Sequence, residues 1–118
     1  MIIFFFCIIH NPGIGRKAAV YVAQNGFHVF ASVRNQKDFD DLAKEAKQNN
    51  LQDNLLPIIL DVTKEDQIIE ATKTVQSFLS KHPHLELVSL INNAGISVRV
   101  PGEYIEISHA KVKRFFFF

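Results

Sequence analysis

The first fifteen residues restrict the fold more than any other stretch of the sequence. An apolar run over residues 1–9 leads into a short polar turn, then into Gly13 and Gly15, and at once into a helical pattern. A strand, a glycine turn and a helix in this order leave backbone N–H groups unpaired at the N-terminus of the helix. The positive end of the helix dipole lies there as well, so this unit predicts a site for an anionic phosphate.

The apolar run itself is predicted to be a buried strand. It is too short to span a bilayer, and it lacks the basic start and the small-residue cleavage site of a signal peptide. An apolar run without alternation is typical of a strand in a parallel sheet that is covered on both faces. The alternative is attachment to a membrane through this run, which we expect less.

Strands and helices alternate along the rest of the chain. Gly26, Asn50 and Pro83 each follow a helical stretch as a stop signal. The expected helices cover residues 15–24, 36–50 and 63–81, and the further strands cover 27–33, 55–62 and 85–91. Because crossovers between parallel strands are right-handed, this order predicts an α/β fold. We expect a doubly wound parallel sheet of about four strands in one domain, residues 1–118.

Two of the helices carry more specific patterns. Phe39, Leu42 and Ala46 recur at helical spacing, which predicts an apolar face that packs on the sheet. Thr63 is predicted to cap the last helix, with Asp66 three residues later in the pattern of a capping box.

Composition excludes several classes of site. The formal net charge of +1 provides no strong basic field, which argues against a nucleic-acid partner. The single cysteine cannot form an internal disulfide, which fits a reducing compartment, so we expect a cytoplasmic protein. The five histidines show no metal-ligand spacing, and only that one cysteine is available to help, so no metal site is predicted.

Three short motifs fall in order at the ends of predicted strands: Gly13-Ile14-Gly15 after the first, Asp61-Val62 after the third and Asn92-Asn93-Ala94-Gly95 after the fourth. With these motifs the chain resembles the short-chain dehydrogenase/reductase family over about residues 2–116. The wording GRKAA, GFHVFASVRN and LDVT is similar to members that act on retinol, steroids or other lipid-like alcohols. The resemblance implies a Rossmann-like fold and a dinucleotide cofactor.

The motifs also carry expected roles. Gly13 and Gly15 lack a side chain, so backbone approaches a pyrophosphate closely and the helix packs tightly on its strand. By resemblance, Asp61 and Val62 lie along the adenine, and the Asp61 carboxylate accepts a hydrogen bond from the adenine amino group. The resemblance places the residues that follow the fourth strand under the ribose, namely Asn92, Ala94 and Gly95.

The end of the second strand predicts which dinucleotide binds. An enzyme that uses NAD carries a carboxylate there for the ribose hydroxyls, whereas a 2′-phosphate requires a cation. Val33 and Arg34 occupy this place, so NADP is predicted over NAD, with Arg34 as the main phosphate contact. Arg16 and Lys17 also favour a phosphate near the first helix. The full set of expected cofactor-binding residues is Gly13, Ile14, Gly15, Arg34, Asp61, Val62, Asn92, Ala94 and Gly95.

Several residues depart from the pattern of the family. Ile8 and Ile9 stand where the phosphate loop usually has Thr-Gly, and Pro12 removes one N–H donor. Neither Tyr21 nor Tyr104 has a lysine four residues later, so the Tyr-x-x-x-Lys pair of the family is absent and no catalytic residue is predicted. We therefore expect a partial NAD(P)-binding domain without the C-terminal catalytic part.

Two functions follow from the sequence and stay open at this point. The first is an NADP(H)-dependent oxidoreductase that acts on the alcohol or carbonyl group of a retinoid, steroid or lipid-like substrate, represented by its dinucleotide-binding half. The second is a catalytically incompetent fragment or gene-model product that at most binds nucleotide. The sequence predicts no particular oligomeric state.

Overall fold

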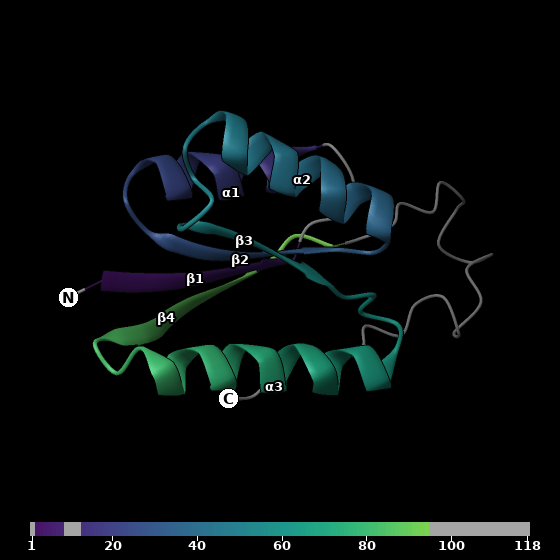
Figure 1. Ribbon diagram of the computed structural model, residues 1–118. Coiled ribbons are helices and arrows are strands. Elements are labelled where there is room, and N and C mark those ends of the chain that lie inside the picture. The colour runs from purple at the N-terminus through teal and green to yellow at the C-terminus, as the bar shows by residue number, and fades with distance from the viewer. Residues whose placement is uncertain (1, 9–12, 95–118) are drawn as a thin grey trace, which may run out of the picture.

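The computed structural model describes residues 2–8 and 13–94, and within them strands and helices alternate as the sequence predicts (Figure 1). The elements in chain order are β1 (Ile2–Ile8), α1 (Ile14–Gln24), β2 (His28–Val33), α2 (Gln36–Gln48), β3 (Leu55–Ile59), α3 (Glu65–Lys81) and β4 (Leu85–Asn92).

The described strands form one parallel sheet in the order β3-β2-β1-β4. The chain moves outward from β1 through β2 to β3, then returns across the sheet to place β4 on the other side of β1. Figure 1 shows α1 and α2 covering one face of the sheet and α3 covering the other. The predicted doubly wound α/β fold is therefore confirmed, and the strand order reverses between β1 and β4.

The face under α1 and α2 is packed with small and branched apolar residues. Ala19 and Ala23 are buried on α1, where their size lets the helix lie close to the sheet. Leu42 of α2 is fully buried, and Phe39 packs against the same cluster, which confirms the predicted apolar face of α2. After α1, Gly26 adopts a left-handed φ of 86°, the backbone conformation that makes glycine a stop signal.

The face under α3 holds a second apolar cluster. Phe30 of β2 and Ile58 of β3 are buried there, together with Ala71 and Val75 of α3. The Phe30 ring meets the Phe78 ring edge-to-face, with 5.4 Å between the ring centroids. Strand β2 is therefore buried on both faces, as expected of an inner strand in a parallel sheet.

Two details of the prediction around α3 are wrong. Strand β3 ends at Ile59 instead of residue 62, although the N–H of Leu60 still donates to the carbonyl of Val33 at 2.7 Å. Lys64, not Thr63, is the N-cap of α3, and it makes no side-chain capping hydrogen bond. The reason is local, because Thr63 donates both its N–H and its hydroxyl to the carboxylate of Asp61.

The beginning of α2 is capped in a way that the sequence analysis missed. The side-chain oxygen of Asn35 accepts a hydrogen bond from the N–H of Asp38 at 2.9 Å. The side-chain amide of Asn35 donates in turn to the Asp38 carboxylate, also at 2.9 Å. This reciprocal pair fixes the point where the chain leaves β2 and turns into α2.

Two classes of site were searched for in the described part of the chain. None of its helices combines the length and the apolar character that a membrane crossing requires. Residues 2–8 and 13–94 also contain no group of histidine, cysteine and acidic side chains arranged to hold a metal ion.

Candidate functional site

The carboxyl ends of the described strands lie together at one edge of the sheet. Ile8 of β1 pairs with Ser32 of β2 on one side and with Asn92 of β4 on the other. Ser32 pairs in turn with Ile58 of β3, so one row of residues crosses the whole described sheet. The segments that follow this row are therefore brought to the same edge, where doubly wound folds bind their ligands.

The N-terminus of α1 lies at this edge, and no side chain of the described residues caps it. Gly13 is the N-cap, with no side-chain capping bond, and the first turn of α1 contains no acidic residue. Ile14 is 82% exposed. By contrast, Asn35 caps α2, and α3 carries Glu65 and Asp66 in its first turn. The positive end of the α1 dipole is therefore the one that no described side chain already offsets.

Gly15 brings α1 against the segment that follows β4. It is buried, and a Cβ atom added to it would overlap the side-chain amide of Asn93. The close approach of the helix to this segment therefore depends on glycine at position 15. Asn93 is absent from the expected set of site residues, although it stands inside the Asn-Asn-Ala-Gly motif that pointed to this edge.

Arg34 and Asp61 follow the paired strands β2 and β3 on the other half of the edge. Arg34 is exposed directly after β2, and Asp61 is half-buried two residues after β3. The Thr63 N–H, at 2.9 Å, and the Thr63 hydroxyl, at 2.7 Å, donate to Oδ1 of Asp61 and lower its pKa. The positive charges of Lys64 and Arg34 lower the pKa of Asp61 further. The carboxylate is therefore ionised at neutral pH and faces a cationic neighbourhood.

The remaining expected site residues divide between packing and exposure. Val62 and Ala94 are half-buried and pack against the apolar cluster under α3. Asn92, the last residue of β4, is exposed. Gly95 lies outside the described residues.

Arg16 is directed elsewhere than expected. Its Nε donates to Oε2 of Glu45 on α2 at 2.7 Å, and both side chains are partly exposed. A hollow of about 500 Å³ lies along this side of α1, lined by Gly13, Lys17 and Tyr21 as well as by the ion pair. Arg16 thus links α1 to α2, and the positive charges that act on Asp61 are those of Lys64 and Arg34.

Comparison with known proteins identifies the family of this chain. A family model for short chain dehydrogenase matches residues 10–117. The chain belongs to this family. The match runs through all three motifs that meet at the edge, from Gly13 to the residues after β4. The resemblance that the motifs predicted is therefore confirmed for the family.

The curated relatives of this chain are named for different substrates. It is 35% identical over 93 residues to a 3-oxoacyl-acyl-carrier-protein reductase of Thermotoga maritima, over 77% of this chain and 35% of the relative. It is 34% identical to an NADPH-dependent 1-acyldihydroxyacetone phosphate reductase of Schizosaccharomyces pombe, over 80% of this chain and 28% of the relative. It is 32% identical to retinol dehydrogenase 7 of Mus musculus, over 81% of this chain and 28% of the relative. The chain thus spans about a third of the length of these relatives.

A solved structure supports the fold of this chain. A short chain dehydrogenase from Bacillus anthracis superposes with a TM-score of 0.67 at 23% identity, covering 90% of this chain and 41% of the other. The parallel sheet with helices on both faces is thus a Rossmann-like arrangement shared with that enzyme.

Proposed function

We propose that this chain is the dinucleotide-binding part of an NADP(H)-dependent oxidoreductase that acts on an alcohol or carbonyl group of a retinoid, steroid or lipid-like substrate. The observation that carries the proposal is the convergence of the strand ends on one edge, where the open N-terminus of α1 lies against the exit of β4. Relatives whose names specify retinol or an acylated dihydroxyacetone phosphate support the substrate class.

The residues at the edge fit a dinucleotide. The N–H groups at the start of α1, from Gly13 through Gly15, would hold the pyrophosphate. Asn92, Ala94 and Gly95 would line the ribose. A bound nicotinamide cofactor would supply the hydride that this family exchanges with alcohols and carbonyls, while these residues bind and orient it.

Asp61 is suited to the adenine that Val62 would contact. Thr63 donates two hydrogen bonds to Oδ1, which fix the direction of the carboxylate. An ionised carboxylate accepts about four hydrogen bonds, so Asp61 keeps capacity for the amino group of adenine. The lowered pKa keeps Asp61 ionised, and so an acceptor, further into the acidic range than an ordinary aspartate.

Arg34 favours NADP over NAD. It is exposed at the end of β2. The side chain of the next residue, Asn35, caps α2. No carboxylate stands directly after β2 to receive the two ribose hydroxyls. A guanidinium group binds a phosphate through paired N–H donors, which gives Arg34 a reason to prefer the 2′-phosphate.

A second candidate function is nucleotide binding without turnover. It is favoured for these 118 residues taken alone, because neither of their tyrosines is followed by lysine four residues later. The only tyrosine in the described part, Tyr21, is exposed on α1.

Calorimetric titration of the 118-residue chain with NADPH and with NADH tests both candidates. We expect NADPH to bind about tenfold more tightly, since a charged hydrogen bond contributes about 1.5–3 kcal/mol. Arg34→Gln should remove this preference, whereas Lys37→Gln, a matched change on exposed α2, should retain it. Equal binding of the two dinucleotides would contradict the choice of NADP, and no binding of either would contradict the site.

Turnover separates the two candidates. Oxidation of NADPH by retinaldehyde in the presence of the protein encoded by the complete transcript that contains these 118 residues would establish the oxidoreductase. Binding of NADPH by that protein without any oxidation would establish the non-catalytic alternative. A chain heated to irreversible unfolding serves as the control for the uncatalysed reaction.

A further inference from the structure

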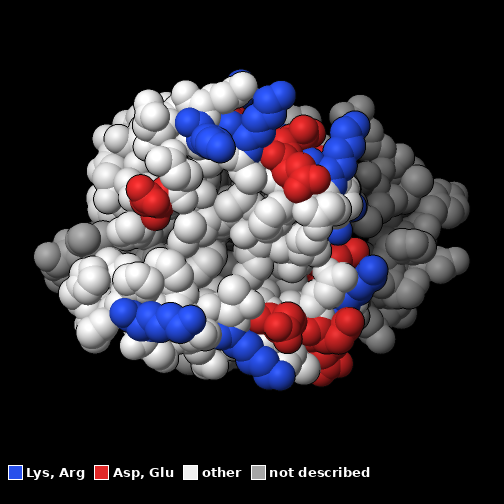
Figure 2. All heavy atoms as spheres, viewed as in Figure 1, with Lys and Arg blue, Asp and Glu red and all other residues white. Residues whose placement is uncertain are grey.

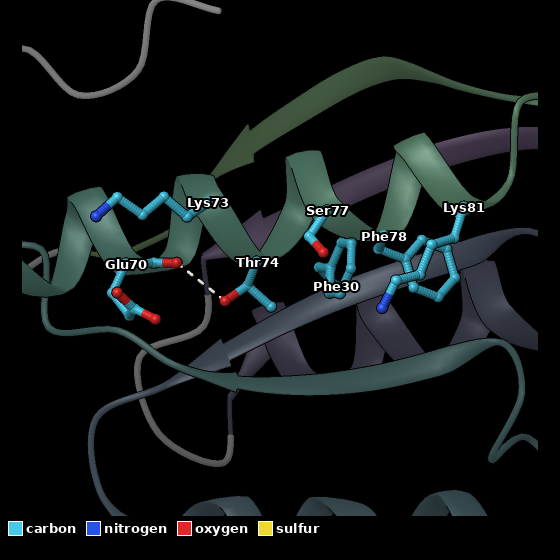
Figure 3. A pocket seen from close by; sticks show the side chains of 7 residues that line it. All are labelled: Phe30, Glu70, Lys73, Thr74, Ser77, Phe78 and Lys81. Atoms are coloured by element: carbon cyan, nitrogen blue, oxygen red, sulfur yellow. Dashed lines mark hydrogen bonds between the residues drawn. The ribbon is translucent and has the colours of Figure 1, made fainter.

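A groove lies on the α3 face of the sheet and is separate from the edge where the strands end. It has a volume of about 460 Å³, within the ~300–1,000 Å³ typical of small-molecule sites. Phe30 of β2 forms its floor. The α3 residues that line it are Glu70, Lys73, Thr74, Ser77, Phe78 and Lys81 (Figure 3).

The bottom of the groove is apolar and firmly placed. Phe30 is only 4% exposed, and its edge-to-face contact with Phe78 holds both rings. Phe78 also stacks on His82, with 4.2 Å between the ring centroids, which restrains it from the other side. An apolar ligand would therefore meet mainly the half-buried Phe78 ring, which is held in place from both sides and needs little reorganisation.

The hydroxyl groups of α3 are not all used in the same way. Those of Thr72, Thr74 and Ser80 each donate to the carbonyl four residues earlier, at 2.9 Å. The hydroxyl of Ser77 makes no such bond and has no hydrogen-bond partner within the described residues. In Figure 3 its hydroxyl points to the side of α3 on which Phe30 lies. The hydroxyl of Ser77 is thus a polar group in the groove that is not hydrogen-bonded to a helix carbonyl.

Charge along α3 favours an anion at one end of the groove. Glu65, Asp66 and Glu70 lie in the first half of the helix, Lys73 lies at its middle, and Lys81 lies in its last turn. Figure 2 shows acidic atoms on the right of the α3 surface and basic atoms to the left of them. Lys81 extends beside the two phenylalanine rings in Figure 3. The cationic end of the groove therefore adjoins its apolar floor.

We propose that this groove binds an amphipathic carboxylate, a molecule with one anionic group on an apolar chain or ring. Lys81 and Ser77, one helical turn apart, hold the carboxylate, and Phe30 with Phe78 contacts the apolar body. Glu70 and Lys73 line the other end of the groove, where their opposite charges offset each other, so the net positive charge lies at the Lys81 end and sets the orientation. The proposal does not depend on dinucleotide binding.

Decanoate labelled with ¹³C at the carboxyl carbon is the probe, followed by NMR titration of the 118-residue chain. We expect saturable one-to-one binding that shifts the carboxyl resonance. Ser77→Glu places a competing carboxylate beside Lys81 and should weaken binding at least about tenfold. Lys81→Gln should weaken it about two- to fivefold, the range of an exposed ion pair.

Matched controls separate this site from general adsorption. Ser80→Glu makes the same charge change on α3 at a residue that does not line the groove. Lys47→Gln removes a lysine from the last turn of α2, as Lys81→Gln does for α3. Both controls should bind decanoate within about twofold of the parent. Thermal unfolding checks that all four variants are folded, which their exposed positions favour.

Three results would overturn the proposal. The first is the absence of saturable decanoate binding by the parent chain. The second is equal weakening by Ser77→Glu and Ser80→Glu, which would show adsorption driven by overall charge. The third is decanol binding as tightly as decanoate, which would show that the carboxylate is not recognised.

Discussion

Gly15, in the first turn of α1, lies directly against the side-chain amide of Asn93, which follows the last residue of β4. This contact joins the element that would hold a pyrophosphate to the strand that lies on the opposite side of the topological switch. The position has room for a hydrogen atom and not for a methyl group. Glycine is therefore required here by packing and not by an unusual φ.

The contact predicts that the effect of Gly15→Ala on stability changes sign when Asn93 is replaced. Gly15→Ala should destabilise the parent chain by about 1–2 kcal/mol, because overpacking of about 1–3 kcal/mol outweighs the gain in helix propensity. In an Asn93→Ala background the obstruction is gone, so the same change should stabilise by up to about 1 kcal/mol. Urea unfolding of the four proteins in this double-mutant cycle measures the coupling.

Gly26→Ala provides a comparison with a different cause. A Cβ atom there has nothing within 4 Å, but the backbone is left-handed with φ 86°. Its cost should therefore be the same in both backgrounds. Equal effects of Gly15→Ala in both backgrounds would contradict the packing argument.

The cap of α2 gives a second prediction. Asn35→Ala should cost about 1 kcal/mol, within the ~0.5–2 kcal/mol typical of a lost N-cap. The loss arises because the N–H of Asp38 no longer has a side-chain acceptor. Thermal unfolding measures the loss, and Asn35→Ser should restore most of the stability because serine also caps. If serine were as destabilising as alanine, packing of Asn35 and not capping would be the cause.

The sequence predicted the alternation of elements and the edge where they meet, because hydrophobic periodicity and chain punctuation are local signals. It predicted the stop at Gly26 and the apolar faces of the helices for the same reason. It missed the cap at Asn35, although the spacing of Asn35 and Asp38 carries a capping pattern. It misplaced the cap of α3, since Thr63 and Asp61 bind each other in a turn that competes with helix capping.

Contacts between distant segments could not be predicted. Nothing local in the sequence pairs Arg16 with Glu45, which lie 29 residues apart, or brings Gly15 to Asn93. Both contacts exist only after α1 has packed on the sheet beside α2 and β4. The expectation that Arg16 serves a phosphate followed from its place in the first turn, and it ignored the competing carboxylate on the neighbouring helix.

The pair of Arg16 and Glu45 gives a third prediction. Each residue opposes the dipole of its own helix, because arginine lies near the start of α1 and glutamate near the end of α2. Replacing either residue by glutamine should therefore change the free energy of unfolding by less than the coupling free energy between the two residues. We expect a coupling of about 0.5–1 kcal/mol at low salt, typical of a partly exposed pair.

Salt distinguishes an ion pair from packing in this case. The coupling measured by urea unfolding should fall when the ionic strength is raised to about 1 M, where the screening length is about 3 Å. A coupling that is unchanged by salt would show that apolar contact of the two stems holds the helices together.

The lowered pKa of Asp61 gives a fourth prediction. A carboxyl group whose pKa is lower in the folded state contributes stability above its ordinary value of 3.8, and this contribution is lost as the pH falls through the folded value. The parent chain should therefore lose more stability than Asp61→Asn between pH 5 and strongly acidic pH. The difference should stay below about 1 kcal/mol, because the side chain is only half-buried.

The hydroxyl of Thr63 is the part of this interaction that mutation can remove. The ¹³C carboxyl resonance of Asp61 reports its pKa directly, and Thr63→Ala should raise that pKa toward 3.8. Thr63→Ser keeps both the hydroxyl and the backbone N–H, so it should leave the pKa low. Were alanine and serine to give the same pKa, the backbone N–H of Thr63 and the nearby cations would account for the whole shift. The carboxylate would then be held at the edge of the sheet without the hydroxyl.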